Sequence, residues 1–114
     1  MSSSNLELLD YIIFFESEPE WIHSDGWYYG VRFLVKRDKE CLLVTLAPDE
    51  AELAVEWWQD GILRIKFKTV MAISWQIHSR DSQEWLWIQC NTERSIFCRI
   101  QLKPYIQVEW EMTW

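Results

Sequence analysis

The alternation of apolar and polar side chains is the feature that most limits the folds open to this chain. From Gly26 almost to the C-terminal end, apolar residues recur at every second position. A period of two places successive side chains on opposite faces of an extended strand. The sequence therefore predicts strands at residues 27–36, 41–46, 63–68, 71–78, 84–90, 96–102 and 106–114.

Short polar segments separate these strands and have the composition of turns. Asp60-Gly61 is the clearest hairpin signal, because both residues tolerate the left-handed backbone of a tight turn. Residues 36–40, 79–83 and 91–95 are further polar turns, and Pro48 and Pro104 interrupt the strand pattern. Residues 51–58 fit a strand or a short helix, since Ala, Glu and Leu favour helices. We prefer the strand.

The N-terminal segment has a different period. Apolar residues from Leu6 to Phe15 form a broad stripe at helical spacing, with Ser4 or Asn5 as an N-cap. Acidic residues after Phe15 oppose the helix dipole, so we expect the helix to end near Glu16. The whole chain, residues 1–114, is predicted to be a single α+β domain, mainly β. Its N-terminal helix precedes a six- to eight-stranded antiparallel meander, folded as a sandwich or a partly closed barrel.

Composition excludes several classes of function. Eighteen acidic against eleven basic residues give a net charge of −7, which argues against a sequence-independent nucleic-acid binder. The apolar runs fall far short of the ~20 residues that a membrane-spanning helix needs. Three cysteines, an odd number, without an N-terminal secretory signal indicate reduced thiols and a cytoplasmic location.

Catalytic and metal-binding patterns are sparse. His23 with Asp25, and His78 with Asp81, are read as turn residues that form local hydrogen bonds. Cys90 and Cys98 lie too far apart for the paired thiolates of a zinc site. We therefore expect a protein without enzymatic activity, cofactor or metal. An enzyme that uses His23 or His78 stays an alternative, and it would need one of these imidazoles in a cleft beside a second functional group.

Tryptophan is unusually abundant, with nine residues in 114. Trp75 and Trp110 fall on apolar strand faces and are predicted to be core. Trp58, Trp85 and Trp87 alternate with other apolar residues, so both faces of their strands are apolar. They therefore require either a second covered face of the sheet or a binding partner.

Charge is concentrated in the first sixty residues, which hold thirteen acidic and four basic side chains, a balance of −9. The remaining residues hold five acidic and seven basic side chains, a balance of +2. Acidic clusters of this kind steer a basic protein toward its binding site. The predicted partner-binding residues are Glu16, Glu18, Glu20, Asp25, Asp49, Glu50, Glu56, Trp58, Trp85 and Trp87.

Two further interpretations stay open. The first is a small-ligand or carbohydrate-binding domain whose aromatic pocket is lined by Trp75, Trp85, Trp87 and Trp110. The second is self-association, with a preference for a homodimer, because unpaired strand edges and surplus aromatic surface can join two copies.

Two segments carry a resemblance to a known class of proteins. Residues 21–25, Trp-Ile-His-Ser-Asp, precede the alternating strands, and residues 63–70 contain the pattern Ile65-x-Phe67-x-x-Val70. In this order of features the chain resembles small bacterial immunity proteins that neutralise polymorphic toxins. The resemblance implies a cytoplasmic, non-enzymatic inhibitor that occludes the active site of a basic toxin or nuclease.

Overall fold

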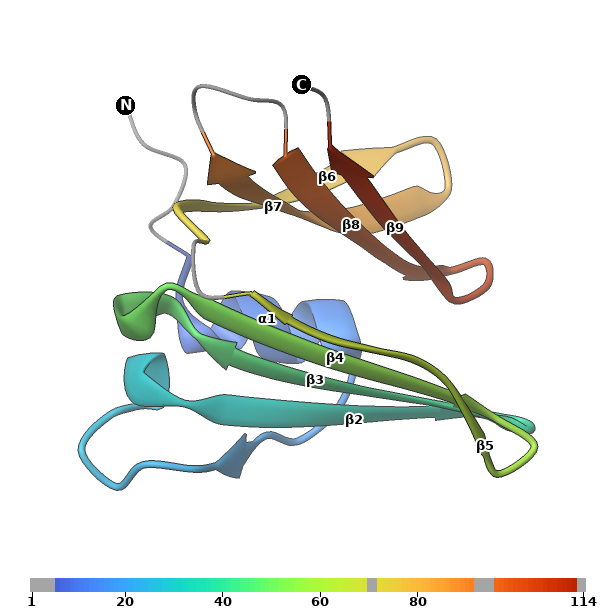
Figure 1. Ribbon diagram of the computed structural model, residues 1–114, viewed down its shortest axis with the longest axis horizontal. Coiled ribbons are helices and arrows are strands. Elements are labelled where there is room, and N and C mark those ends of the chain that lie inside the picture. Colours follow the sequence, from blue (N-terminus) through green and yellow to red (C-terminus); the bar gives the residue numbers. More distant parts are fainter. Residues whose placement is uncertain (1–5, 70–71, 92–95, 113–114) are drawn as a thin grey trace. The chain divides into compact units, whose positions relative to one another are not determined.

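The computed structural model describes residues 6–69, 72–91 and 96–112. The chain divides into two compact units, one of residues 15–70 and one of residues 1–14 with 71–114. Each unit contains one antiparallel sheet (Figure 1). The two units are described separately below, and the prediction of a single domain stays a prediction.

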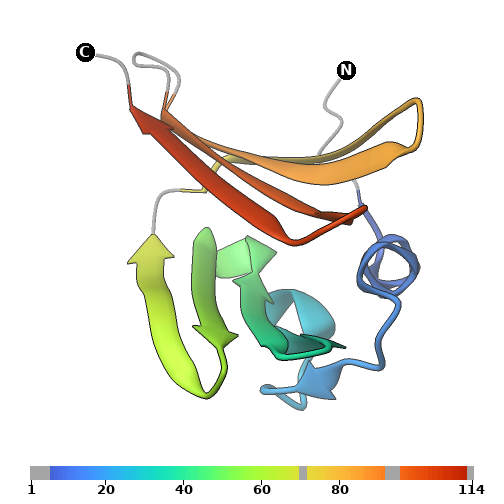
Figure 2. The same cartoon turned by 90° about the vertical axis from the view of Figure 1, so that its right-hand side faces the viewer.

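A five-stranded sheet with the strand order β1-β2-β3-β4-β5 forms the first unit. Its edges are the two-residue strand β1 and the strand β5, the second arm of the β4–β5 hairpin (Figure 2). The strands are β1 (Glu20–Trp21), β2 (Val31–Arg37), β3 (Glu40–Ala47), β4 (Glu52–Gln59) and β5 (Ile62–Thr69). Two short 3₁₀ helices, η1 (Trp27–Tyr29) and η2 (Pro48–Glu50), precede β2 and β4 and pack against each other.

One face of this sheet is a continuous apolar core. Its β2, β3 and β4 side chains are at most 4% exposed, and they occupy alternate positions in each strand. They are Val31, Phe33, Val35, Leu42, Val44, Leu46, Leu53 and Val55. The alternation predicted from the sequence is confirmed for these strands, and the segment predicted at residues 51–58 is a strand, not a helix, beginning at Glu52 after Ala51 ends η2. Pairing with β3 and β5 on both sides outweighs the helical propensity of Ala and Glu.

Helix α1 (Leu8–Phe15) confirms the predicted N-terminal helix. The Asp10 carboxylate accepts a hydrogen bond of 2.8 Å from the Glu7 backbone N–H, which satisfies one donor at the helix start. The predicted caps Ser4 and Asn5 lie outside the described residues. After Phe15, Glu16 adopts a left-handed backbone (φ 51°), and the helix ends there as predicted. The Phe15 ring, 1% exposed, stacks on Phe33 with 4.6 Å between ring centroids.

The second unit contains a four-stranded sheet with the order β6-β7-β8-β9. The strands are β6 (Ser74–Arg80), β7 (Gln83–Asn91), β8 (Ile96–Lys103) and β9 (Gln107–Met112). Cross-strand pairing aligns Trp75, Ile88, Cys98 and Trp110 in one row of a single face. Leu86, Ile88, Cys98 and Ile100 on this face are fully buried, so it is the core side of the sheet.

The predicted fold class is confirmed: one N-terminal helix followed by antiparallel strands, mainly β. Among the described residues no strand pairs the first sheet to the second, so the chain forms two separate sheets and not a closed barrel. The described residues contain nine strands, because the two-residue β1 adds to the predicted set. No helix in the described ranges is long and apolar enough to cross a membrane.

Three details of the sequence prediction are wrong. Trp27 and Tyr29 lie in η1 and not at the start of a strand, because Gly30 breaks the alternating pattern before β2. Trp110 is 39% exposed and not core, since its strand β9 is the sheet edge and has a neighbour on one side only. Ile73 precedes β6 and is 49% exposed.

A matched pair of leucines tests the register of the first sheet. Leu42 is fully buried, whereas Leu34, on the opposite face of the neighbouring strand, is 41% exposed. Leu42→Ala should lower the free energy of unfolding by about 3 kcal/mol, and Leu34→Ala by less than about 1 kcal/mol. Urea unfolding followed by tryptophan fluorescence measures both. Equal losses, or a larger loss for Leu34→Ala, would show that the register is wrong.

Candidate partner-binding surfaces

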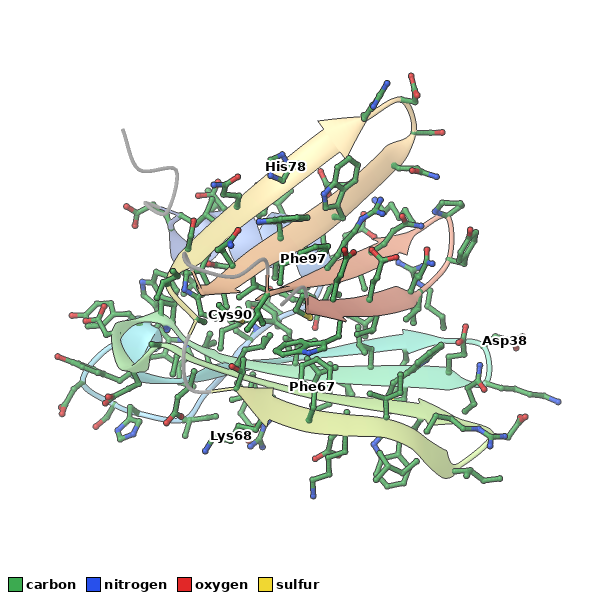
Figure 3. All side chains as sticks on the ribbon, turned by 45° about the horizontal axis from the view of Figure 1, so that its top comes forward. Asp38, Phe67, Lys68, His78, Cys90 and Phe97 are labelled. Carbon is green, nitrogen blue, oxygen red and sulfur yellow. The ribbon has the colours of Figure 1, made fainter. Side chains whose placement is uncertain are left out.

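The side of the four-stranded sheet that faces away from its core carries four aromatic rings and an arginine. This surface is called the aromatic face here and consists of His78, Trp85, Trp87, Phe97 and Arg99. Cross-strand pairing sets His78 opposite Trp85, and Trp87 opposite Arg99. His78 and Phe97 stand on this side of the sheet in Figure 3. Their strand neighbours in sequence point to the core, because side chains alternate along each strand.

Ring contacts cover the indole surfaces on this face. The His78 ring stacks on Trp85 with 5.7 Å between ring centroids and lies edge-on to Trp87 with 6.4 Å between centroids. The Arg99 guanidinium lies 4.5 Å from the centre of the Trp85 ring, in cation–π geometry. Trp87 stacks on Phe97 at 4.0 Å. Because β6 and β8 flank β7, His78 and Arg99 approach Trp85 from opposite sides.

Polar contacts tie the aromatic face to its neighbours. The Arg99 guanidinium lies 4.0 Å from the Glu109 carboxylate and donates to the Gln101 side-chain oxygen at 3.5 Å. His78 Nε2 lies 2.9 Å from Gln76 Oε1. Two buried atoms, Arg99 Nε and Gln101 Nε2, have no hydrogen-bond partner among the described residues.

Two open hollows flank the tryptophans of this face. The larger, about 470 Å³, is lined by Arg80, Asp81, Gln83, Trp85, Trp87, Phe97, Arg99 and Glu109. The smaller, about 370 Å³, is lined by Gln76, His78, Trp85 and Trp87. Trp75 and Trp110 belong to the other face of the sheet. The four tryptophans proposed from the sequence therefore do not line one pocket together, whereas Trp85 and Trp87 line both hollows.

A second surface lies at one end of the five-stranded sheet, where η1 and η2 pack together (Figure 1). It is called the acidic–aromatic end here and consists of Trp21, Ile22, Asp25, Tyr28, Tyr29, Asp49 and Glu50. Its four apolar side chains are among the exposed large hydrophobic residues of the chain: Trp21 is 51%, Ile22 45%, Tyr28 37% and Tyr29 38% exposed. All three acidic residues are exposed. Exposed apolar and negatively charged residues thus lie on neighbouring segments at this end.

Two glycines fix the geometry of this end. A Cβ atom at Gly26 would lie 2.7 Å from the Tyr28 ring, so the ring packs directly on the glycine backbone. A Cβ atom at Gly30 would lie 3.2 Å from Ile22 Cβ, and the Ile22 N–H donates to the Gly30 carbonyl at 3.0 Å. The Tyr29 ring lies edge-on to the rings of Tyr28 and His23, with 4.8 and 6.3 Å between ring centroids.

The acidic cluster predicted at residues 49–56 is divided by strand pairing. Glu56 lies opposite Lys66 and accepts a hydrogen bond of 3.2 Å from the Trp58 indole. Glu52 lies 3.8 Å from the Lys68 ammonium, which offsets its charge. Asp49 and Glu50 lie on η2, outside the paired strands, and both are exposed.

The ten predicted residues therefore fall in four places. Glu20, Asp25, Asp49 and Glu50 lie at or beside the acidic–aromatic end, with Glu20 paired to Arg32 at 3.3 Å. Glu16 and Glu18 are exposed in the connection between α1 and β1. Glu56 and Trp58 share the outer face of β4, and Trp85 and Trp87 belong to the aromatic face. That these groups bind a partner stays a prediction.

Neither a protein-family model nor a curated protein matches the sequence. A structure search finds a chain of a contact-dependent growth inhibition toxin–immunity protein complex from Klebsiella pneumoniae 342. The two chains superpose with a TM-score of 0.85 at 16% identity, over 99% of this chain and 100% of that one. The match shows a shared fold. It confirms the resemblance to toxin–immunity systems at the level of structure.

Sequence reasoning missed the partners of these tryptophans and the exposed tyrosines. The register of the hairpins contains a signal for the partners of the tryptophans. A two-residue turn at Asp81 and Ser82 places His78 opposite Trp85, whereas a five-residue turn was expected at residues 79–83. The Asp60-Gly61 turn alone would set Glu56 opposite Ile65, and a bulge between Trp57 and Trp58 shifts the register so that Glu56 lies opposite Lys66. The tyrosines had no such signal, because residues 27–29 were assigned to a strand.

The three cysteines are free thiols in different environments. Cys41 is half-buried and lines a hollow of about 490 Å³ beside Trp58, whereas Cys90 and Cys98 are 5% and 0% exposed. Burial, with a smaller contribution from Cys90, raises the pKa of Cys98 to about 12. No group of three His, Cys, Asp or Glu side chains within the described ranges is placed to hold a metal ion.

These environments predict the order in which the thiols react. At pH 8 a disulfide reagent such as Ellman's should modify Cys41 in seconds to minutes, because the thiolate is the attacking species. Cys90 and Cys98 should react only after unfolding in urea. Absorbance at 412 nm counts the thiols and peptide mass spectrometry locates them. Rapid modification of Cys98 in the folded protein contradicts its placement in the core.

Proposed function

We propose that this chain is an immunity-type inhibitor, a cytoplasmic protein that binds a toxin and neutralises it without catalysing a reaction. The fold carries this proposal, because the match to a chain of a toxin–immunity complex extends over nearly the whole of both chains. Fold alone does not specify function. The surfaces described above therefore supply the second line of support.

Two surfaces of the chain have the composition of protein-binding sites. The aromatic face combines tryptophans and an arginine with a polar rim, the residue types that dominate interface energetics. The acidic–aromatic end combines exposed rings with carboxylates. Inhibition by occlusion needs only such a surface, held rigidly, and no reactive group.

The histidines also favour binding over catalysis. The contacts described for His23 and His78 are to Tyr29, Gln76, Trp85 and Trp87, and a general base works with an oriented nucleophile or carboxylate. The contacts present hold each imidazole against aromatic rings and do not assemble a reactive pair.

A titration separates inhibition by binding from enzymatic inactivation. The proposal predicts a toxin gene beside the gene for this chain, and its toxic domain, called the neighbouring toxic domain here, is the partner to test, with its own activity as the readout. An inhibitor that binds one to one should abolish activity at about equimolar protein, and activity should return when the complex is dissociated. Complete, irreversible loss at a small fraction of one equivalent would indicate catalysis and overturn the proposal.

Protection in cells provides the matching test. Expression of this chain should restore growth to cells that express the neighbouring toxic domain. The toxin of the Klebsiella pneumoniae 342 complex serves as the control, because 16% identity leaves few shared surface residues. We expect no protection against that toxin. Absence of protection against the neighbouring domain, together with absence of binding, contradicts the proposed function.

A further inference from the structure

The acidic–aromatic end is an apolar patch whose shape is fixed before any partner arrives. The Tyr28 ring rests on Gly26, Tyr29 packs on Tyr28, and Ile22 is held against Gly30 by a backbone hydrogen bond. Side chains that are already ordered lose little conformational entropy on binding. This end can therefore offer exposed rings to a partner at low entropic cost.

Exposure of this kind is costly in water unless a partner covers it. Trp21, Ile22, Tyr28 and Tyr29 are between 37% and 51% exposed within a short stretch of chain. Monomeric proteins rarely expose apolar side chains in contiguous groups, whereas binding sites do. Tryptophan and tyrosine are also the residues that most often act as anchors in protein interfaces.

Charge identifies the kind of partner. Asp25, Asp49 and Glu50 are exposed at this end, and the neighbouring cation Arg32 lies 3.3 Å from the Glu20 carboxylate. Of the other basic residues of this unit, Lys68 lies near η2 but is 3.8 Å from the Glu52 carboxylate, and the rest lie around the β2–β3 turn at Asp38 or farther along β5. The end therefore has an excess of negative charge around its rings.

Lysine and arginine side chains fit both parts of such a surface. Their charged groups pair with carboxylates, and a cation placed over a tyrosine or tryptophan ring gains cation–π attraction. Their aliphatic stems pack on the same rings. A partner surface rich in Lys and Arg thus satisfies the charge and the apolar area together.

We infer that the acidic–aromatic end is the docking surface for a Lys- and Arg-rich face of the toxin, with Trp21, Tyr28 and Tyr29 as anchors. This inference rests on the proposed function and adds the surface and the partner chemistry to it. The aromatic face of the other sheet is the alternative location. Its charges nearly balance, since Arg80 and Arg99 face Asp81 and Glu109 around the larger hollow.

Matched variants of the full chain test the anchors. Trp21→Ala should weaken binding of the neighbouring toxic domain at least tenfold, about 1.4 kcal/mol. Tyr105→Ala is the control, because Tyr105 is 58% exposed in the turn between β8 and β9 and lies outside the proposed surface. Its effect should stay within about twofold. Thermal unfolding confirms that each variant is folded.

Neutral substitutions test the charges. Asp49→Asn with Glu50→Gln should lower the association rate constant about fivefold at 50 mM salt, with a smaller effect at 500 mM. Asp38→Asn is the control, because Asp38 is an exposed acid at the opposite end of the sheet and Asn tolerates its left-handed backbone (φ 54°). Its association rate should match that of the unaltered chain within about twofold.

The outcomes distinguish the surface from the function. If Trp87→Ala weakens binding tenfold while the variants of the acidic–aromatic end do not, the toxin docks on the aromatic face and the inference is wrong, although the proposed function stands. If the unaltered chain does not bind the toxic domain at all, the proposed function fails. Loss of binding in the variants of the acidic–aromatic end, with both controls unaffected, supports the inference.

Discussion

The register of the hairpins is the constraint on which the rest of this structure depends. Three two-residue turns begin with an aspartate in the left-handed region, Asp38, Asp60 and Asp81, with φ between 51° and 58°. Such turns match the twist of the strands they join and set the register of the residues next to the turn. A slip of one residue would move every side chain to the other face. The pairing of β2 with β3, of β4 with β5 and of β6 with β7 begins at these turns, and the last of them sets His78 opposite Trp85 on the aromatic face.

Local patterns in the sequence were sufficient for the helix and for most strands. Phe33, Val44 and Val55 are buried where alternation places them, and residues 52–59 form a strand because the hairpin at Gly61 supplies a partner. The local patterns did not show how much of a side chain the neighbouring strands cover. Trp110 lies on the core face, as its alternation predicts, but its strand β9 is at the edge of the sheet. A neighbouring strand covers its side chain on one side only.

The candidate site was less predictable than the fold because charge and exposure depend on pairing. The acidic residues of β4 read as one cluster along the sequence, yet strand β5 brings Lys66 and Lys68 beside Glu56 and Glu52. Counting residues outward from Asp60-Gly61 would have placed Glu56 opposite Ile65, because the bulge between Trp57 and Trp58 that shifts the register has no signal in the turn. Contact of η1 with η2 joins segments 20 residues apart, and no local signal predicts such a contact. That contact is what brings Tyr28 and Tyr29 near Asp49 and Glu50.

The division of the chain into two units has a consequence for the order of events during synthesis. Residues 15–70 form one uninterrupted unit whose strands all pair with their neighbours in sequence. Such local pairing closes short loops and favours rapid folding. The other unit joins residues 1–14 to residues 71–114, so it must wait for the C-terminal half to leave the ribosome. The acidic–aromatic end therefore lies in the half of the protein that can be complete first, while the aromatic face is assembled last.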